Sequence, residues 1–377
     1  MERKLASIQI IENIQPIEGA DFIEVACVLG WECVIKKGEY RIGDHCIYIE
    51  IDSIVPDILY FEFMKERKFR VKTIKLKKQI SQGLVVPLSL LKNRSSGMFK
   101  KYYVGDDVTK ELGVKKYDPE IVDGRTPGTK HHGGLNPFPL DVPKTDEIRI
   151  QSAPQLLEEM KGKPFYRTQK QDGCSATYMF NNNGKFLVCS RNHSIPEFHK
   201  IKRSWRERLF AKPWRPFTKY NVKTDESLYW RIARKYDIQE KIKSLEYFNF
   251  AFQGEICAPG LQKNRLRLTE PDFFVFDVFD RNLQRYLNFD SAFTIVSEMR
   301  LRFVPLLETG RCFNYTKEDL LEKAKGFYPG TKNHKEGDVW RCYYNDHSNV
   351  LNEDKKFKSK PHISFKVLNN DYLLKEE

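Results

Sequence analysis

A lysine followed two residues later by an aspartate is at the centre of the chemistry that this sequence can perform. Lys170 begins the segment Lys-Gln-Asp-Gly, and its ε-amine, with an unperturbed pKa of about 10.4, is a nucleophile only after it loses its proton. A bound metal and neighbouring cations would lower the pKa of Lys170 and so activate it. Asp172 can orient the lysine or hold metal-bound water, and Gly173 lets the backbone approach a ligand closely. Glu255 and Glu336 are carboxylates that suit Mg²⁺, which keeps several waters and takes few carboxylates directly.

Lys170 alone carries little weight, because a Lys-x-Asp-Gly segment recurs by chance and also suits a solvated turn. Five further motifs follow it in order: Ser190–Asn192, Gly254–Glu255, Phe273–Asp277, Glu336–Arg341 and Ser364–Val367. The series resembles the superfamily of ATP-dependent polynucleotide ligases and mRNA capping enzymes. It is most similar to RNA ligases that have an OB-like module in front of the ligase domain. This resemblance covers nearly the whole chain, including Lys4–Ile8, Gly19–Asp21, Gln79–Leu84, Pro143–Glu147, Pro259–Asn264 and Asn369–Leu374.

The resemblance implies a role for each motif residue. Lys170 is expected to attack the α-phosphate of ATP and to carry AMP covalently, with Asp172 and Lys366 as the other catalytic residues. Lys366 would neutralise charge on the α-phosphate as pyrophosphate leaves. The expected nucleotide contacts are Arg149, Gln169, Gly173, Arg191, Glu255, Phe276 and Lys366. Mg²⁺ or Mn²⁺ would be held, largely through water, by Asp172, Glu255 and Glu336.

Some of these roles have an alternative. Phe276, whose counterpart stacks on adenine, could instead be an ordinary core residue. Arg149, expected at the ATP phosphates, and Arg191 could each form an ordinary surface salt bridge. The sequence also departs from the family at Ser364, because many relatives have Lys-x-Lys where this chain has Ser-x-Lys. Either Lys366 suffices alone, or Lys358 or Lys360 takes the second place.

Composition limits the class of protein. The chain of 377 residues is 40% hydrophobic, which is enough for two packed domains, and its net charge of +13 suits a partner rich in phosphates. It has no apolar run long enough to span a membrane and no secretory signal, so we expect an intracellular protein, cytoplasmic or nuclear. The eight cysteines form no Cys-x-x-Cys pair and are expected to be reduced and mostly buried.

The sequence predicts an α+β chain in two domains. Residues 1–105 read as short β-rich runs separated by glycines, which favours a small OB-like β-barrel that binds nucleic acid. In 69–78, apolar and basic residues alternate, with a phase slip near Thr73, and Arg70 and Lys72 are the candidate nucleic-acid contacts. Residues 106–144 are rich in Gly and Pro and predict a linker. Residues 145–377 predict an antiparallel-sheet nucleotidyltransferase domain; only eleven residues follow Lys366, so the OB-like barrel is expected at the N-terminus.

A basic insertion is predicted near 198–223. It contains nine Lys or Arg and one acid, which gives a net charge of +8, and five aromatic residues lie among them. Aromatic rings can stack on bases while cations follow phosphates, but a solvated insertion anchored by its aromatics is an equal alternative. The candidate contacts are Lys202, Arg203, Arg206 and Arg208.

Together these features predict a monomeric ATP-dependent RNA ligase that joins 3′-OH and 5′-phosphate ends, such as nicks in a duplex with an RNA 3′-OH strand, in RNA repair. A DNA ligase or an mRNA guanylyltransferase is the alternative enzyme. A non-catalytic RNA-binding protein on a ligase scaffold is the alternative without chemistry, and intact Lys170, Asp172, Glu255, Glu336 and Lys366 argue against it.

Overall fold

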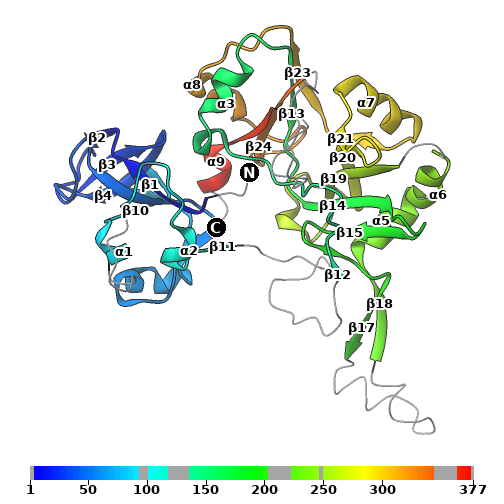
Figure 1. Cartoon of the computed structure of the whole chain (residues 1–377), viewed down its shortest axis with the longest axis horizontal. Coiled ribbons are helices and arrows are strands. Elements are labelled where there is room, and N and C mark those ends of the chain that lie inside the picture. Colours follow the sequence, from blue (N-terminus) through cyan, green and yellow to red (C-terminus); the bar gives the residue numbers. More distant parts are fainter. Residues whose placement is uncertain are drawn as a thin grey trace. The chain divides into compact units, whose positions relative to one another are not determined.

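The structure, a computed structural model, describes residues 4–92, 101–117, 136–202, 222–245, 249–343 and 363–374. The chain divides into two compact units (Figure 1). The first unit joins three stretches of sequence, Met1–Pro119, Ile148–Gln155 and Asn370–Glu377. The second comprises Glu120–Glu147 and Leu156–Asn369. Two short segments that the sequence analysis included in the second domain therefore group with the first unit, and the expected linker 106–144 is shared between the two.

Side-chain hydrogen bonds hold the three stretches of the first unit together. The Ser152 hydroxyl bonds to Glu50, the Arg149 guanidinium donates to Asp52, and the Gln82 amide donates to Asn370 over 3.0 Å. Each pair joins residues far apart in sequence. The first unit is therefore a discontinuous piece of the chain.

Short antiparallel strands build the first unit. They form sheets in the orders β1-β5-β10, β2-β3-β4, β11-β6-β7 and β8-β9. Their bounds are β1 Ala6–Ile10, β2 Asn13–Pro16, β3 Ile23–Val28, β4 Trp31–Lys36, β5 His45–Ile49, β6 Ser53–Ile54, β7 Arg70–Val71, β8 Thr73–Leu76, β9 Gln79–Gln82, β10 Leu84–Val86 and β11 Lys115–Lys116. Helices are short: η1 Leu59–Arg67, α1 Ser89–Lys92, α2 Thr109–Leu112, η2 Ile150–Ser152 and α9 Asn370–Leu374.

Strand β4 shows why this sequence curls around a core. Trp31, Cys33 and Ile35 are buried, whereas the residues between them face outward, so one side of the strand is apolar. These side chains pack with Ala26, Val28 and Tyr48 from neighbouring strands. The predicted run 69–78 is divided at Lys72, which lies between β7 and β8, close to the expected phase slip.

Two antiparallel sheets build the second unit. The larger has eight strands, ordered β12-β16-β15-β14-β19-β20-β21, with β22 added in parallel to β20. Their bounds are β12 Asn136–Pro137, β14 Cys174–Phe180, β15 Phe186–Cys189, β16 His193–Ser194, β19 Phe250–Cys257, β20 Asp272–Asp280, β21 Arg285–Tyr286 and β22 Arg302–Phe303. The smaller sheet is ordered β23-β13-β24-β25, with β13 Phe165–Gln169, β23 Leu306–Gly310, β24 Gly337–Cys342 and β25 Ser364–Leu368.

Helices cover the larger sheet of the second unit. Figure 1 shows α5 and α6 beside β14 and β15, and α7 beside β20. The helix bounds are α3 Gln155–Met160, α5 Leu228–Lys235, α6 Ile238–Lys243, η3 Gln262–Asn264, α7 Phe289–Glu298 and α8 Lys317–Ala324. Ile232, Ile238 and Val296 lie in one apolar core with Phe252 and Phe273 of the sheet. A separate hairpin pairs β17 Phe198–Lys202 with β18 Val222–Glu226.

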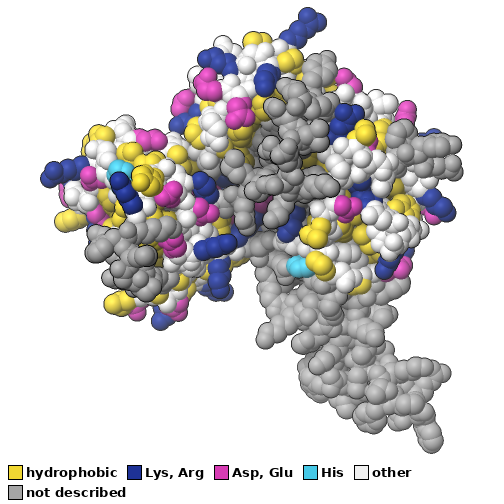
Figure 2. Space-filling model, viewed as in Figure 1, with side chains coloured by type: hydrophobic (Ala, Val, Ile, Leu, Met, Phe, Trp, Pro, Cys, Tyr) yellow, Lys and Arg dark blue, Asp and Glu magenta, His cyan; other side chains and the backbone are white. Residues whose placement is uncertain are grey.

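The surface of the described residues carries both signs of charge. Figure 2 shows basic and acidic side chains intermingled on its visible face. The centre of the predicted basic insertion, residues 203–221, lies outside the described residues. None of the helices within the described ranges is long and apolar enough to cross a membrane.

An ion-pair cluster in the first unit gives a test of the fold. Asp52, in a left-handed turn (φ 62°), accepts from Arg70 and from the buried Arg149, and Arg70 also lies 3.7 Å from the centre of the Tyr117 ring. Burial alone would raise the pKa of Asp52, but Arg149 and Arg70 lower it more, to well below its ordinary value of 3.8. The carboxylate therefore contributes stability above pH 3.8, and this contribution is lost as the pH falls below it.

We predict that Asp52→Asn lowers the stability of the first unit at pH 7, because the buried Arg149 loses its counter-charge. The loss should be smaller than the about 3–5 kcal/mol of a fully buried pair, since the Asp52 side chain is 27% exposed. Urea unfolding from pH 7 to pH 2 should show a gap to wild type that is constant above about pH 4 and shrinks as the pH falls below 3.8. The exposed Asp57→Asn is the control, and a gap that stays constant with pH would contradict the assignment.

Candidate active site

Lys170 lies where β13 ends beside β24. Its N–H donates to the carbonyl of Gly337 over 2.9 Å, which extends the β13–β24 ladder by one residue. Its Nζ donates to Oε2 of Glu336 at 2.8 Å, and the two side chains are only 21% and 17% exposed. The Lys170 motif and the motif Glu336–Arg341 therefore meet, because they lie at adjoining ends of paired strands.

Gly337, next to Glu336, allows β24 and β25 to approach each other closely. It has a φ of +146°, and a Cβ there would lie 2.1 Å from the carbonyl oxygen of Val367 on β25. A similar contact explains why residue 173 is a glycine, because a Cβ there would lie 2.1 Å from the carbonyl oxygen of Ile256 on β19. The close approach that the structure shows at Gly173 is thus to the protein backbone.

The charges around Lys170 differ from those expected. Burial alone would lower its pKa, but Glu336, Glu255 and Asp172 together raise it well above the ordinary value. In the protein by itself, the groups that raise its pKa are carboxylates, and the expected lowering of the pKa by a bound metal and further cations stays a prediction. Lys170 is therefore protonated in this structure.

Glu255, on β19, is a carboxylate of the site whose pKa is raised. Burial raises its pKa from 4.5 to about 7, and the charge of Glu336 adds to the increase. Lys170, Arg191 and the N–H of Gly173 work in the opposite direction. Near neutral pH this carboxyl therefore exchanges a proton readily.

Asp172 is buried, and its Oδ2 lies 3.5 Å from Nε of Arg265. Asp172, Glu255 and Glu336 offer the oxygen donors that Mg²⁺ and Mn²⁺ prefer. Among the described residues, however, no three His, Cys, Asp or Glu side chains are close enough to hold a metal directly. The chemistry of these oxygen donors fits Mg²⁺ or Mn²⁺, and their role as metal ligands stays a prediction.

Arg191 and Lys366, both expected at the nucleotide, converge on one carboxylate. Asp146 lies 3.1 Å from Nη2 of Arg191 and 3.9 Å from Nζ of Lys366. Arg191 follows β15 and Lys366 lies on β25, so Asp146 connects the two sheets. An acidic residue stands where the family resemblance predicted phosphate contacts.

The next residue, Glu147, explains how Ser364 is accommodated. The Ser364 hydroxyl donates to Glu147 over 2.8 Å, and Glu147 is also 3.1 Å from Nη2 of Arg341. The same guanidinium lies 3.4 Å from Asp277 and about 6.0 Å from the Phe276 ring. A fully buried arginine therefore accompanies the serine that replaces a lysine.

The remaining predicted residues are placed as follows. Gln169 is buried, and its side-chain oxygen accepts from Gln171 over 3.0 Å. Phe276 is partly exposed in a strand that is otherwise buried, so both a stacking and a core role stay open. Arg149 belongs to the first unit, and its Nε and Nη1 have no hydrogen-bond partner among the residues that the structure describes.

The nucleic-acid candidates remain predictions. Arg70 is held by Asp52 and Tyr117 in the first unit, and Lys72 is partly buried. Lys202 ends β17, where only the backbone is described, and Arg203, Arg206 and Arg208 lie outside the described residues.

Sequence reasoning missed four residues of the site: Asp146, Glu147, Tyr328 and Arg341. Arg341 ends the predicted motif Glu336–Arg341, and Asp146 and Glu147 lie in the segment Pro143–Glu147, so a signal existed for these three. Tyr328 had none. Its hydroxyl donates to the Lys170 carbonyl over 3.0 Å and accepts from the N–H of Glu336 over 3.2 Å.

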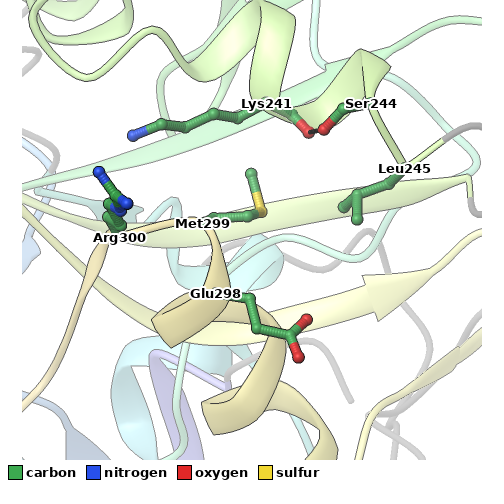
Figure 3. A pocket seen from close by; sticks show the side chains of 6 residues that line it. All are labelled: Lys241, Ser244, Leu245, Glu298, Met299 and Arg300. Carbon is green, nitrogen blue, oxygen red and sulfur yellow. Dashed lines mark hydrogen bonds between the residues drawn. The ribbon is translucent and has the colours of Figure 1, made fainter.

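A shallow pocket of about 330 Å³ lies elsewhere in the second unit, between the ends of α6 and α7. Figure 3 shows Lys241 and Arg300 at one end of it and the Glu298 carboxylate pointing away from them. None of the predicted site residues lines this pocket.

Comparisons with known proteins agree with this architecture. A family model described as an OB-fold domain matches residues 5–88, and one described as RNA ligase matches residues 163–366. The second match contains every motif from Lys170 to Lys366, and the predicted fold, an OB-fold domain followed by an antiparallel-sheet nucleotidyltransferase domain, is confirmed. The chain belongs to the RNA ligase family.

Solved structures of Naegleria gruberi RNA ligase are similar over the whole chain. A mutant with AMP and Mn is 30% identical, with a TM-score of 0.77 and coverage of 100% of both chains. Another mutant, with ATP and Mn, is 30% identical, with a TM-score of 0.76 and coverage of 99% of this chain and 100% of that one. The complex with PPi is 31% identical, with a TM-score of 0.75 and coverage of 98% of both. No curated protein sequence matches the chain.

The raised pKa of Glu255 predicts how stability depends on pH. Between pH 4.5 and about 7 the folded protein holds a proton that the unfolded chain releases, so stability falls as the pH rises through this window. Glu255→Gln, which imitates the protonated form, should flatten the fall and be more stable than wild type at pH 8. Thermal unfolding without divalent cations would measure both. The exposed Glu298→Gln should behave as wild type, and an unchanged pH profile in Glu255→Gln would contradict the assigned pKa.

Proposed function

We propose that the protein is an ATP-dependent RNA ligase that forms a covalent lysyl-AMP at Lys170. The observation that carries the proposal is the pairing of a buried Lys170 with Glu336, with Glu255 and Asp172 close enough to shift its pKa. A lysine held among carboxylates is a poor nucleophile by itself, but it is suited to a reaction that brings a cation into the site.

Three steps follow from this assignment. Nζ of Lys170 attacks the α-phosphorus of ATP, a P–N bond forms, and pyrophosphate leaves. The AMP then passes to a 5′-phosphate end, which frees Lys170. A 3′-OH attacks that 5′-phosphate, forms the phosphodiester and releases AMP. The structures of the Naegleria relative with ATP and Mn, AMP and Mn, and PPi support the first step.

The residues of this chain divide the work of the first step. Mg²⁺ or Mn²⁺, when bound, offsets the negative charge of carboxylates and phosphates, which lowers the pKa of nearby groups. Asp172, Glu255 and Glu336 would hold it, largely through water. Glu336 also fixes Nζ of Lys170 at 2.8 Å from its carboxylate. Once that charge is offset, Lys170 can release its proton.

Cations of the site would bind the phosphates. Lys366 and Arg191, which share Asp146, would exchange this carboxylate for phosphate oxygens when ATP enters. Two buried nitrogens of Arg149, Nε and Nη1, have no partner within the described part of the chain, which supports its proposed contact with an ATP phosphate. Phe276 would stack on the adenine.

The proposed substrate is a nicked duplex with an RNA 3′-OH strand, sealed by a monomer in the course of intracellular RNA repair. The charge of +13 supports a phosphate-rich partner. Residues 5–88 match an OB-fold domain, and such folds bind single strands and loops of nucleic acid. We propose that Arg70 and Lys72 of this domain contribute to RNA contact.

We predict that Lys170→Arg abolishes the covalent adduct, with a loss of at least about 10³-fold. Arginine keeps the positive charge beside Glu336 but stays protonated, so it cannot attack phosphorus. Labelling with α-labelled ATP and Mg²⁺ or Mn²⁺, followed by acid precipitation, would measure the adduct. Lys325→Arg, at an exposed lysine paired with Glu322, is the matched control.

The outcomes of this assay separate the alternatives. Full labelling of Lys170→Arg would remove the central assignment. Labelling of wild type by GTP rather than ATP would indicate a guanylyltransferase, and sealing of nicks with a DNA 3′-OH strand alone would indicate a DNA ligase. Absence of any adduct in wild type would favour a non-catalytic RNA-binding protein.

The basic insertion predicts the salt dependence of RNA binding. Replacing Lys202, Arg203, Arg206 and Arg208 together by Ser should weaken binding to a nicked duplex. It should also flatten the plot of log K against log salt by a few units, because each phosphate contact contributes about 0.9 unit. Adduct formation from free ATP should not change.

A control for this change replaces four exposed lysines elsewhere by Ser, namely Lys65, Lys161, Lys185 and Lys243. The net charge falls equally, so a smaller effect on the slope would separate local contact from overall charge. An equal slope in the insertion variant and in wild type would show that the insertion does not touch phosphate.

A further inference from the structure

One hydroxyl group joins the nucleophile to its carboxylate partner. Tyr328 is 1% exposed, and its OH donates to the main-chain carbonyl of Lys170 at 3.0 Å while it accepts from the main-chain N–H of Glu336 at 3.2 Å. Lys170 and Glu336 are the residues whose side chains pair at 2.8 Å. Both ends of the ion pair are thus attached, through the backbone, to the same oxygen atom.

The hydroxyl is needed because the strand ladder ends here. The N–H of Lys170 still pairs with Gly337, and the carbonyl of Glu336 still accepts from Asn369 over 3.0 Å. Beyond these bonds, the chain bends at Asp172 and Gly173, so the carbonyl of Lys170 has no strand beside it. A backbone group shielded from water and left without a partner destabilises the fold, and Tyr328 supplies the partner for two partly buried groups.

The loop that carries Tyr328 is itself well fixed. The N–H of Tyr328 donates to Asn333, that of Lys335 donates to Gly326, and the rings of Phe327 and His334 lie 4.6 Å apart. These contacts within the loop, together with the bond from Lys335 Nζ to Asp338 on β24 over 2.7 Å, hold the segment that carries the tyrosine ring.

The same loop is also connected, through Arg265, to the carboxylate of Asp172. The Asn333 amide donates to the Arg265 carbonyl over 2.6 Å, and the Arg265 side chain is 3.5 Å from Asp172. Tyr328 of this loop thus bonds to the backbone of Lys170 and Glu336. Asn333 of the same loop bonds to Arg265, which pairs with Asp172.

We propose that Tyr328 is a positioning residue for adenylylation, whose hydroxyl sets the placement of Lys170 relative to Glu336. The inference rests on the proposed function, because it concerns the first step of the ligase reaction. Tyr328 acts through the backbone of these two residues. Its effect should therefore fall on the rate of attack by Lys170 and leave the binding of ATP largely unchanged.

The test is Tyr328→Phe, which removes one oxygen atom and keeps the ring. A displacement of about 1 Å at a reacting group can cost about 10²-fold in rate. We expect the rate constant for lysyl-AMP formation at saturating ATP to fall 10- to 100-fold, while the KM for ATP changes by less than about threefold. Single-turnover labelling over a range of ATP concentrations gives both values.

Tyr178→Phe is the matched control. Tyr178 lies on β14, is fully buried, and its OH donates to the carbonyl of Tyr229 over 3.0 Å. This variant also loses one buried hydroxyl, so the fall in its unfolding temperature should be similar to that of Tyr328→Phe. Its rate constant for adenylylation should stay within twofold of wild type.

Each result has one meaning. A selective fall of the rate constant in Tyr328→Phe supports the positioning role. A rate within twofold of wild type, a rise in KM that accounts for the loss, or an equal loss in Tyr178→Phe would overturn it while the proposed function stands. Absence of an adduct in wild type would overturn the proposed function, and this inference with it.

Discussion

The ion pair between Lys170 and Glu336 is the interaction on which the rest of the site depends. A mostly buried ammonium group needs a negative partner, and the carboxylates that stabilise it also keep it protonated. The same contact therefore secures the folded site and suppresses the chemistry of the amine. In the reaction that we propose, a bound cation would relieve this suppression by offsetting the charge of the carboxylates.

Strand pairing brings the other residues of the site close to this ion pair. Lys170 and Glu336 stand at adjoining ends of β13 and β24, Lys366 lies on the next strand, and Glu255 lies on the larger sheet. The pair Asp146 and Glu147 connects the two sheets through Arg191, Lys366, Arg341 and Ser364. Two adjacent acidic residues before β13 thus neutralise cations that come from both sheets.

The features that could be predicted from the sequence are those that depend on local residue patterns and on motifs. The OB-fold domain and the antiparallel-sheet nucleotidyltransferase domain are present as expected. Strands β14, β15 and β20 form in segments rich in apolar and β-branched residues. Features that depend on residues far apart in the sequence could not be predicted from it. They are the direction of the pKa shift of Lys170, the contact of Arg149 with Asp52 across 97 residues, and the hydrogen bonds of Tyr328. Sequence spacing does not show which charges face one another after folding.

The discontinuous make-up of the first unit bears on how the chain folds during synthesis. Domains generally fold in order as they leave the ribosome, the N-terminal one first. Here the barrel strands are made early, Arg149 and Ser152 arrive later, and Asn370 of α9 follows the second unit. Until they are made, Asp52, Glu50 and Gln82 lack these partners. The first unit therefore begins to form before the second unit but gains its last stretch only after nearly all of the second unit has been translated.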